Sequence, residues 1–199
     1  LWLQQHEREA YRAARWALQP KDWLRFRMSG DVATDPSDAS ATLLADIDGV
    51  WSAQLLEALD MRADWLPPVK PAHAAAGELD ARVAQALGLR PGIPLAVGAG
   101  DTPAAALGSG LLHDADAQLT TGTGGQIVVV RAQRPSYDAS LNAYRSAAPQ
   151  PFAQWYAMAA MLNVGSALEW VRALLGYDWE TAYAAAVQAA PESVMFLPY

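Results

Sequence analysis

A short apolar run that ends in glycines and is followed at once by a carboxylate is the feature that most limits how this chain can fold. Residues 93–100 read IPLAVGAG and come directly after Pro91-Gly92. A bounded run of this kind predicts a short buried strand. The residues after Asp101, TPAAALGSGLL, are small and favour a helix, with Pro103 suited to its first turn. The sequence therefore predicts an α/β fold in which a carboxylate lies between a strand and a helix.

Two interpretations of Asp101 stay open on the residues alone. As a helix N-cap, its side chain would accept a hydrogen bond from an otherwise unpaired backbone N–H. As a general base, it would stand at a strand end, where open α/β sheets place their sites, and the adjacent glycines would let a large substrate approach the backbone. A dinucleotide-binding motif is excluded, because GxGxxG would need glycine where Pro103 stands.

A second apolar pattern is interrupted by a glycine-rich turn. Residues 118–121 and 126–130 flank the segment Gly122-Thr123-Gly124-Gly125. Two strands joined by a tight turn are the simplest interpretation. The same turn suits a phosphate nest, in which successive backbone N–H groups and a threonine hydroxyl converge on an anion. The two interpretations are compatible, since a hairpin turn can also bind a phosphate.

The remaining pattern predicts further helices and strands. Residues 1–18 show helical spacing that Pro20 stops, and residues 29–46, rich in Ser, Thr and Asp, predict an irregular loop. Other helices are expected at residues 21–28, 54–59, 78–87, 162–174 and 181–190, and other strands at residues 141–145, 152–158 and 194–197. The most apolar stretch, residues 156–175, is interrupted by three polar residues and predicts a buried helix, not a membrane span.

Charge and residue content exclude several classes of function. Fourteen Lys and Arg against 21 Asp and Glu leave a net charge of −7, which does not favour binding to nucleic acid. The chain has no cysteine, so disulfides, thiolate nucleophiles and Cys-ligated metals are excluded. Three scattered histidines argue against a His-rich metal site. The first residues lack the pattern of an export signal, and a cytoplasmic location is expected.

Five blocks, taken in their order, resemble the FGGY family of carbohydrate kinases. They read KDWLRFRMSGDVATDPSDASATLLADI, PGIPLAVGAGDTPAAALGSGLL, TTGTGGQIVVV, MLNVGSALEWVRALLG and VMFLPY, and within the family they look most like xylulokinases. The resemblance implies an α/β fold of the actin-like, ribonuclease H-like ATPase kind, with two lobes that close on ATP and a sugar. It implies that residues 1–110 are the C-terminal part of the first, sugar-binding lobe. Residues 111–199 would be the N-terminal part of the second, ATP-binding lobe.

The resemblance also implies roles for the matched positions. Asp101 aligns with the catalytic aspartate that accepts the proton of the sugar hydroxyl, and Asp101 and Thr102 would contact the substrate. Thr102 departs from the Asn common in xylulokinases and the Gln of glycerol kinases, so the exact sugar stays open. Thr34 and Asp35 match a motif that borders the core of the first lobe, where a packing role is expected. The residues implied in ATP binding are Gly122, Thr123, Gly124, Gly165 and Glu169.

The implied activity is ATP-dependent phosphorylation of a sugar hydroxyl, with ATP and Mg²⁺ as cofactors and D-xylulose as the first expected substrate. Ribulose, gluconate, fuculose and polyols are alternative acceptors, and a non-catalytic fragment or an actin-like relative is the alternative outside sugar phosphorylation. The family's first phosphate loop would lie before Leu1, so the isolated 199-residue chain is expected to be inactive. The expected partners are the sugar and ATP, with no membrane or nucleic acid, and a homodimer is the candidate assembly.

Overall fold

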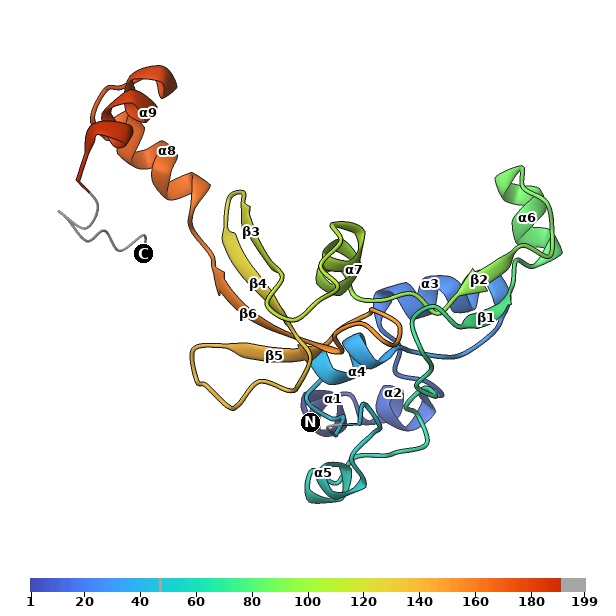
Figure 1. The fold of residues 1–199 in the computed structure, drawn as a ribbon. Helices are drawn as coiled ribbons and strands as arrows, with labels where there is room; N and C mark the ends of the chain where they lie inside the picture. Colours follow the sequence, from blue (N-terminus) through green and yellow to red (C-terminus); the bar gives the residue numbers. More distant parts are fainter. Residues whose placement is uncertain (47, 191–199) are drawn as a thin grey trace.

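The computed structural model describes residues 1–46 and 48–190, which form two arrays of secondary structure (Figure 1). The N-terminal array is mainly helical. Its helices are α1 (Trp2–His6), α2 (Arg8–Ala13), α3 (Pro20–Ser29), α4 (Pro36–Ala41), α5 (Ala53–Ala58) and α6 (Ala81–Leu87). The strands β1 (Ala75–Glu78) and β2 (Pro94–Ala96) pair antiparallel next to α3.

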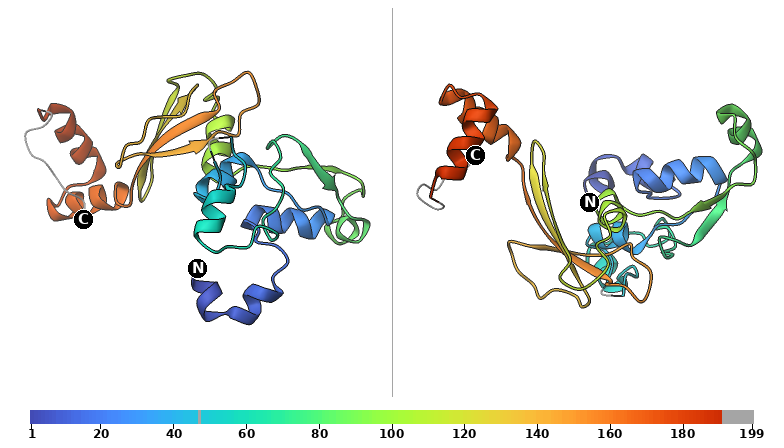
Figure 2. Two further views of the ribbon diagram at one scale, coloured as in Figure 1. Left: turned by 90° about the horizontal axis from the view of Figure 1, so that it is seen from below. Right: turned by 45° about the horizontal axis from the view of Figure 1, so that its top comes forward.

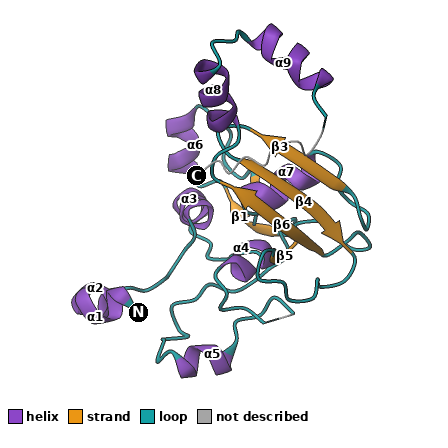
Figure 3. Ribbon diagram, turned by 90° about the vertical axis from the view of Figure 1, so that its left-hand side faces the viewer, coloured by secondary structure: helices purple, strands orange, loops and turns teal. Residues whose placement is uncertain are grey.

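The C-terminal array is built on a four-stranded antiparallel sheet. Its elements are α7 (Asp101–Gly108), β3 (Ala117–Thr121), β4 (Gly125–Arg131), β5 (Asn142–Arg145), β6 (Trp155–Met161), α8 (Gly165–Leu174) and α9 (Trp179–Gln188). The strand order is β3-β4-β6-β5. Helix α7 lies across one face of this sheet (Figure 3). Helices α8 and α9 continue beyond the end of the sheet (Figure 2).

The larger apolar core joins α7 to the sheet. Along β4 the side chains alternate, as a strand with one covered face requires: Val128 and Val130 are buried, whereas Ile127 between Gln126 and Val128 is 49% exposed. The buried cluster consists of Ala106, Leu111, Val128, Val130, Ala153 and Tyr156. The helix that begins at Asp101 is therefore anchored on the strand that begins at the glycine-rich turn.

One side-chain contact links the two arrays away from this core. The Ser40 hydroxyl on α4 accepts a hydrogen bond from the backbone N–H of Arg145 on β5, at 3.0 Å. Helix α4 lies beside β5 in Figure 1 and packs against it. The N-terminal array thus touches the sheet through α4.

Several expected elements are confirmed with shifted ends. The hairpin of residues 118–130 is present as β3 and β4, and the helices expected at 21–28 and 54–59 are present as α3 and α5. The helical spacing of residues 1–18 is present only as α1 and α2, which break at Glu7 and end at Ala13, so the helix does not run to Pro20. Pro20 instead begins α3, since proline needs no N–H at the first helical position. The strand expected at 93–100 is shorter, and the expected burial is wrong, because no residue of β2 is buried and the flanking Ile93 is 36% exposed. The strand expected at 194–197 lies outside the described residues.

Three expectations were wrong in part. Residues 29–46 are not wholly irregular, because Asp35 caps α4 and accepts a hydrogen bond from the Ser37 N–H at 2.9 Å. The helix expected from residue 78 begins after a strand, since Asp80 is the N-cap of α6 and β1 precedes it. Residues 156–175 are not one buried helix but β6 followed by α8, and α8 buries none of its residues.

None of the helices in the described part of the chain combines the length and the apolar character that crossing a bilayer requires.

Candidate functional site

Asp101 is exposed at the first position of α7, at the end of a short strand connection. The N-cap is Gly100, not Asp101, so the N-cap interpretation of Asp101 is wrong. The carboxylate accepts a hydrogen bond from the N–H of Thr102 at 2.6 Å, and the Thr102 hydroxyl lies 3.4 Å from the same oxygen. Unpaired N–H groups give a helix N-terminus a partial positive charge, which stabilises a carboxylate there. The structure thus presents an oxygen acceptor to solvent on a helix that is fixed to the sheet.

The glycine-rich turn is a tight hairpin. Thr121 pairs with Gly125 across the turn, and the Gly122 N–H donates to the Gly124 carbonyl at 2.8 Å. This bond confirms the hairpin interpretation and occupies one N–H that a phosphate nest would use. A hollow of about 300 Å³ lies beside the turn and is lined by Thr120, Gly122, Gly124, Gly125, Gln126, Ala160 and Met161.

The start of α8 is bonded directly to this turn, which brings together four of the five residues implied in ATP binding. The Gly165 N–H donates to the Gly122 carbonyl and the Val164 N–H to the Thr123 carbonyl, each at 2.8 Å. The Ser166 hydroxyl lies 3.3 Å from the same Thr123 carbonyl. Gly122 and Gly165 are more than 40 residues apart in the sequence, so the sequence pattern does not reveal that they are in contact.

Glycine at position 165 has a steric reason. A Cβ atom there would lie 2.4 Å from the Gly122 carbonyl oxygen and 3.1 Å from its carbon. Gly124 has a similar restriction, since a Cβ atom would lie 2.7 Å from the Met161 carbonyl oxygen. A side chain at position 165 would force the helix away from the turn, and one at position 124 would force the turn away from the end of β6.

Gly165→Ala is therefore expected to destabilise the protein by about 1–3 kcal/mol, the usual cost of overpacking, and to weaken ATP binding. Thermal unfolding and ATP titration of the full-length protein would measure both effects. Gly108→Ala is the matched control, because a Cβ atom on this helical glycine meets open space. An alanine at position 165 that leaves both the melting temperature and the ATP affinity at parental values would contradict the close contact.

Glu169, the fifth residue implied in ATP binding, is paired with a cation. It lies one turn after Gly165 on α8 and forms an ion pair with Arg172, whose Nε is 3.0 Å from its carboxylate. The hydrogen bond from Arg172 lowers the pKa of Glu169 below its usual value. The structure thus places Glu169 on the helix that meets the turn, but with its carboxylate engaged by Arg172.

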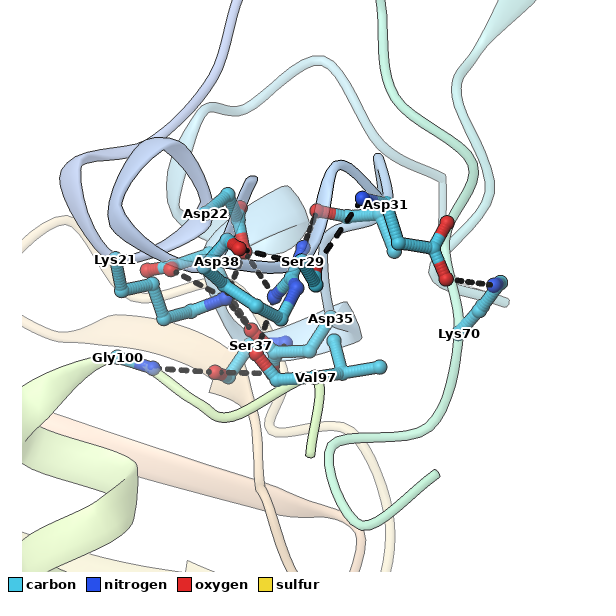
Figure 4. Close-up of polar contacts among 12 residues, drawn as sticks. Lys21, Asp22, Ser29, Asp31, Asp35, Ser37, Asp38, Lys70, Val97 and Gly100 are labelled. Atoms are coloured by element: carbon cyan, nitrogen blue, oxygen red, sulfur yellow. Dashed lines mark hydrogen bonds and ion pairs between the residues drawn. The ribbon is translucent and has the colours of Figure 1, made fainter. Parts of the chain in front are cut away.

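A largely buried group of charges, which we call the charge cluster, lies beside Val97 and Gly100 (Figure 4). It consists of Lys21, Asp22 and Arg25 on α3, and Asp35 and Asp38 at the start of α4. The Lys21 ammonium lies 2.7 Å from Asp22, 3.1 Å from Asp35 and 3.2 Å from Asp38. Asp22 and Asp35 have no exposed surface. Burial of ions without partners is costly, so these charges depend on one another.

The electrostatics of the charge cluster follow from this burial. Burial lowers the pKa of Lys21, but the hydrogen bond to Asp22 and the charge of Asp35 outweigh it, and the net pKa is raised. Burial raises the pKa of Asp38, and Lys21 offsets this only in part. The sequence pattern alone does not predict the charge cluster. The Asp35-Pro36 N-cap pattern was the available signal, and the packing role expected for Thr34 and Asp35 agrees with their burial.

Tyr156 on β6 is a buried phenol near the charges of Asp101 and Asp38. Its ring is buried in the core of the sheet and packs 5.5 Å from the ring of Tyr144. Burial raises the pKa of Tyr156, and the nearby charges of Asp101 and Asp38 add to this. The phenol of β6 thus lies within electrostatic range of both the α7 carboxylate and the charge cluster.

Within residues 1–46 and 48–190, no three His, Asp or Glu side chains are arranged to hold a metal ion. The carboxylates of the charge cluster surround Lys21 instead.

Comparisons with known proteins agree on one family. The profile of the FGGY family of carbohydrate kinases, N-terminal domain, matches residues 1–108. The chain is 36% identical to a xylulose kinase of Escherichia coli, over the whole chain and 41% of that protein. It is 37% identical to an autoinducer-2 kinase of E. coli, over 71% of the chain and 27% of that protein.

The fold agrees with the sequence comparisons. The structure of a xylulose kinase from Rhodospirillum rubrum matches with a TM-score of 0.83 and 26% identity, over 96% of this chain and 39% of that one. The predicted α/β, actin-like fold is thereby confirmed. The chain spans about two fifths of the length of the E. coli xylulose kinase. The division of the chain at residue 110 stays a prediction.

Proposed function

Since this chain belongs to the FGGY family of carbohydrate kinases, we propose that the full-length protein transfers the γ-phosphoryl group of ATP to a sugar hydroxyl. D-Xylulose is the proposed acceptor. The observation that carries this proposal is the alignment of the whole chain with a xylulose kinase at 36% identity. The exposed carboxylate of Asp101, on a helix fixed to the sheet, supplies the group that the chemistry needs.

Asp101 is the proposed general base. Phosphoryl transfer passes through a loose transition state, so the protein mainly positions the reactants and stabilises charge. The base receives the proton of the attacking hydroxyl, and such assistance is typically worth about 10²–10⁴-fold in rate. Asp101 and Thr102 would both lie next to the sugar, and the Thr102 hydroxyl can donate or accept a hydrogen bond to it.

The nucleotide is proposed to bind where α8 meets the glycine-rich turn. Backbone N–H groups at the turn would face the phosphates, and the hollow beside Gly122 and Gly124 offers space next to them. Gly165 would border the nucleotide through its backbone, because the Gly122 carbonyl fills the space that a side chain would need. Glu169 could accept a hydrogen bond only after exchange of its Arg172 partner. Mg²⁺ is proposed to arrive with the ATP phosphates, where it would neutralise their charge.

The two parts of the site lie on different elements. We propose that residues 1–110 belong to the sugar-binding lobe and residues 111–199 to the ATP-binding lobe. Closure of the two lobes would exclude water, which otherwise competes with the sugar for the γ-phosphate. A cytoplasmic location and a homodimer stay predictions.

A substrate panel tests the proposed acceptor. We expect the full-length protein with Mg-ATP to release ADP fastest with D-xylulose, by about tenfold or more in kcat/KM over other acceptors, since each 1.4 kcal/mol of differential binding is worth that factor. The panel would contain D-ribulose, L-fuculose, gluconate and glycerol, and reactions without sugar would serve as the blank. A higher kcat/KM for any of these would reassign the substrate, and no sugar-dependent ADP release would reject the kinase proposal.

A second candidate acceptor deserves a place in the same panel. An autoinducer-2 kinase is 37% identical to the chain over 71% of the chain's length, whereas the xylulose kinase is 36% identical over all of it. The departure at Thr102 is compatible with an acceptor other than D-xylulose. We therefore include the autoinducer-2 signal molecule, and its preference over D-xylulose would favour this second assignment.

A further inference from the structure

The backbone that leads to Asp101 is bonded at one end to Arg25 of the charge cluster and at the other end to Ser37 on α4. The Val97 carbonyl accepts a hydrogen bond from the Arg25 guanidinium, and the Gly100 N–H donates to the Ser37 hydroxyl at 3.2 Å. Arg25 also donates to the Ala33 carbonyl. Figure 4 shows Val97 and Gly100 on either side of these contacts. The segment from Val97 to Gly100 is therefore held by side chains from α3 and α4.

Ser37 lies at the centre of this arrangement. Its hydroxyl donates to Asp35 at 2.6 Å and so presents its lone pairs to the Gly100 N–H. Asp35 is in turn held by Lys21, 3.1 Å away. Ser37 is 2% exposed and Asp35 fully buried, so water cannot replace either partner without moving the backbone. A continuous chain of polar contacts thus runs from Lys21 through Asp35 and Ser37 to the residue before Asp101.

The glycine-rich segment from Val97 to Gly100 depends on contacts with other elements for its conformation. Gly98 has a φ of +83°, and Gly100 also has no side chain, so the segment itself restricts its own conformation weakly. A Cβ atom on Gly100 would lie 3.0 Å from an Asp38 oxygen, which shows how closely the backbone lies against the charge cluster. The direction in which α7 begins is thus set by contacts with α4.

We propose that Ser37, oriented by Asp35 and Lys21, is a positioning residue that fixes the Asp101 carboxylate for proton acceptance during phosphoryl transfer. The inference rests on the proposed function, because it needs Asp101 to be the base. A displacement of a reacting group by about 1 Å can cost about 10²-fold in rate. Loss of the Ser37 hydroxyl would leave the Gly100 N–H unpaired and loosen the start of α7. The effect should fall on kcat and not on ATP binding.

The test is a double-mutant cycle in the full-length protein with D-xylulose, or the best acceptor of the panel, and Mg-ATP. Ser37→Ala is expected to lower kcat by about 10- to 100-fold, with the KM for ATP within about twofold of the parent. In an Asp101→Ala background, Ser37→Ala should change the residual rate by less than about twofold, because it acts through the group already removed. Ser37→Thr keeps the hydroxyl and should restore most of the rate.

The control and the contrary outcomes are specific. Thr42→Val removes a hydroxyl from the other end of α4, where it bonds the backbone of Ala39 and Leu44, and should leave kcat unchanged. If Ser37→Ala does not fold, Ser37→Cys keeps the volume with a poor acceptor and should show the same loss. A parental kcat in Ser37→Ala, or an equal loss in the Asp101→Ala background, overturns the positioning role. A parental kcat in Asp101→Ala alone rejects the proposed base, and the positioning role with it.

Discussion

Asp101→Ala in the full-length protein is expected to lower kcat for sugar phosphorylation by about 10²–10⁴-fold, the usual contribution of a general base. ATP affinity should stay at the parental value, because Asp101 begins α7 and the proposed nucleotide contacts lie on the turn and on α8. Steady-state kinetics would give the first quantity and calorimetric titration with ATP the second. Asp101→Asn should lower kcat by the same factor, since an amide keeps the shape of the side chain but cannot accept the proton.

Asp138→Asn is the matched control for this pair. Its carboxylate is on an exposed loop and accepts hydrogen bonds from the backbone and hydroxyl of Ser140. The same chemical change there should not alter kcat. Near-normal turnover in Asp101→Asn would remove the base assignment, even if the protein proved to be a sugar kinase.

Lys21→Met is expected to have the largest effect on stability. The substitution keeps the aliphatic length but leaves Asp22, Asp35 and Asp38 with less compensation for their negative charge. Removal of one partner from a buried ion pair costs about 3–5 kcal/mol, and the lower end applies because the Lys21 side chain is 22% exposed. Thermal unfolding of the full-length protein at neutral pH would measure the loss.

The pH dependence of this loss identifies its cause. The pKa of Lys21 is raised in the folded state, so the stability that its charge contributes is complete below its unfolded pKa of about 10.4 and is lost as the pH rises through the folded value. At acidic pH, protonation of Asp38, whose pKa is also raised, removes part of the uncompensated charge in the variant. The difference between parent and Lys21→Met should therefore be greatest near neutral pH and shrink on both sides.

Arg131→Met provides the comparison for an exposed ion pair. Arg131 lies 3.5 Å from Asp114, and both side chains are about half exposed. Pairs of this kind contribute little to stability, so the melting temperature should stay at the parental value at every pH. A Lys21→Met variant that behaves like Arg131→Met would contradict the dependence of the charge cluster on Lys21.

The parts of the site that could be predicted from sequence are those set by short-range signals. The turn at Gly122 lies between two apolar runs, and the strand-to-helix passage at Asp101 is bounded by glycines and a proline, so both follow from neighbouring residues. The Asp35-Pro36 pattern is an equally local signal for α4, yet the Ser and Asp content of residues 29–46 also favours a loop. The same side chains favour turns and helix caps, and only the following residues distinguish the two.

The remainder depends on contacts between distant residues. Ser37 and Gly100 are 63 positions apart, and Gly165 meets Gly122 only because β6 pairs with β4 and returns the chain to the turn. Polar residues such as Asp22 and Arg25 are ordinarily exposed, and their burial depends on their mutual ion pair and on the distant Val97 carbonyl that Arg25 also bonds. A single sequence does not contain the register or packing that creates these contacts.

The contact between α4 and β5 gives this short helix two attachments. Ser37 and Ser40 lie one helical turn apart, and their hydroxyls accept hydrogen bonds from the backbone of Gly100 and of Arg145, respectively. One turn of helix is nearly rigid. A rotation of the sheet at Arg145 would therefore move Ser37 and, through it, Gly100. The orientation of the Asp101 carboxylate and the angle between the two arrays would then change together, because both depend on the position of α4.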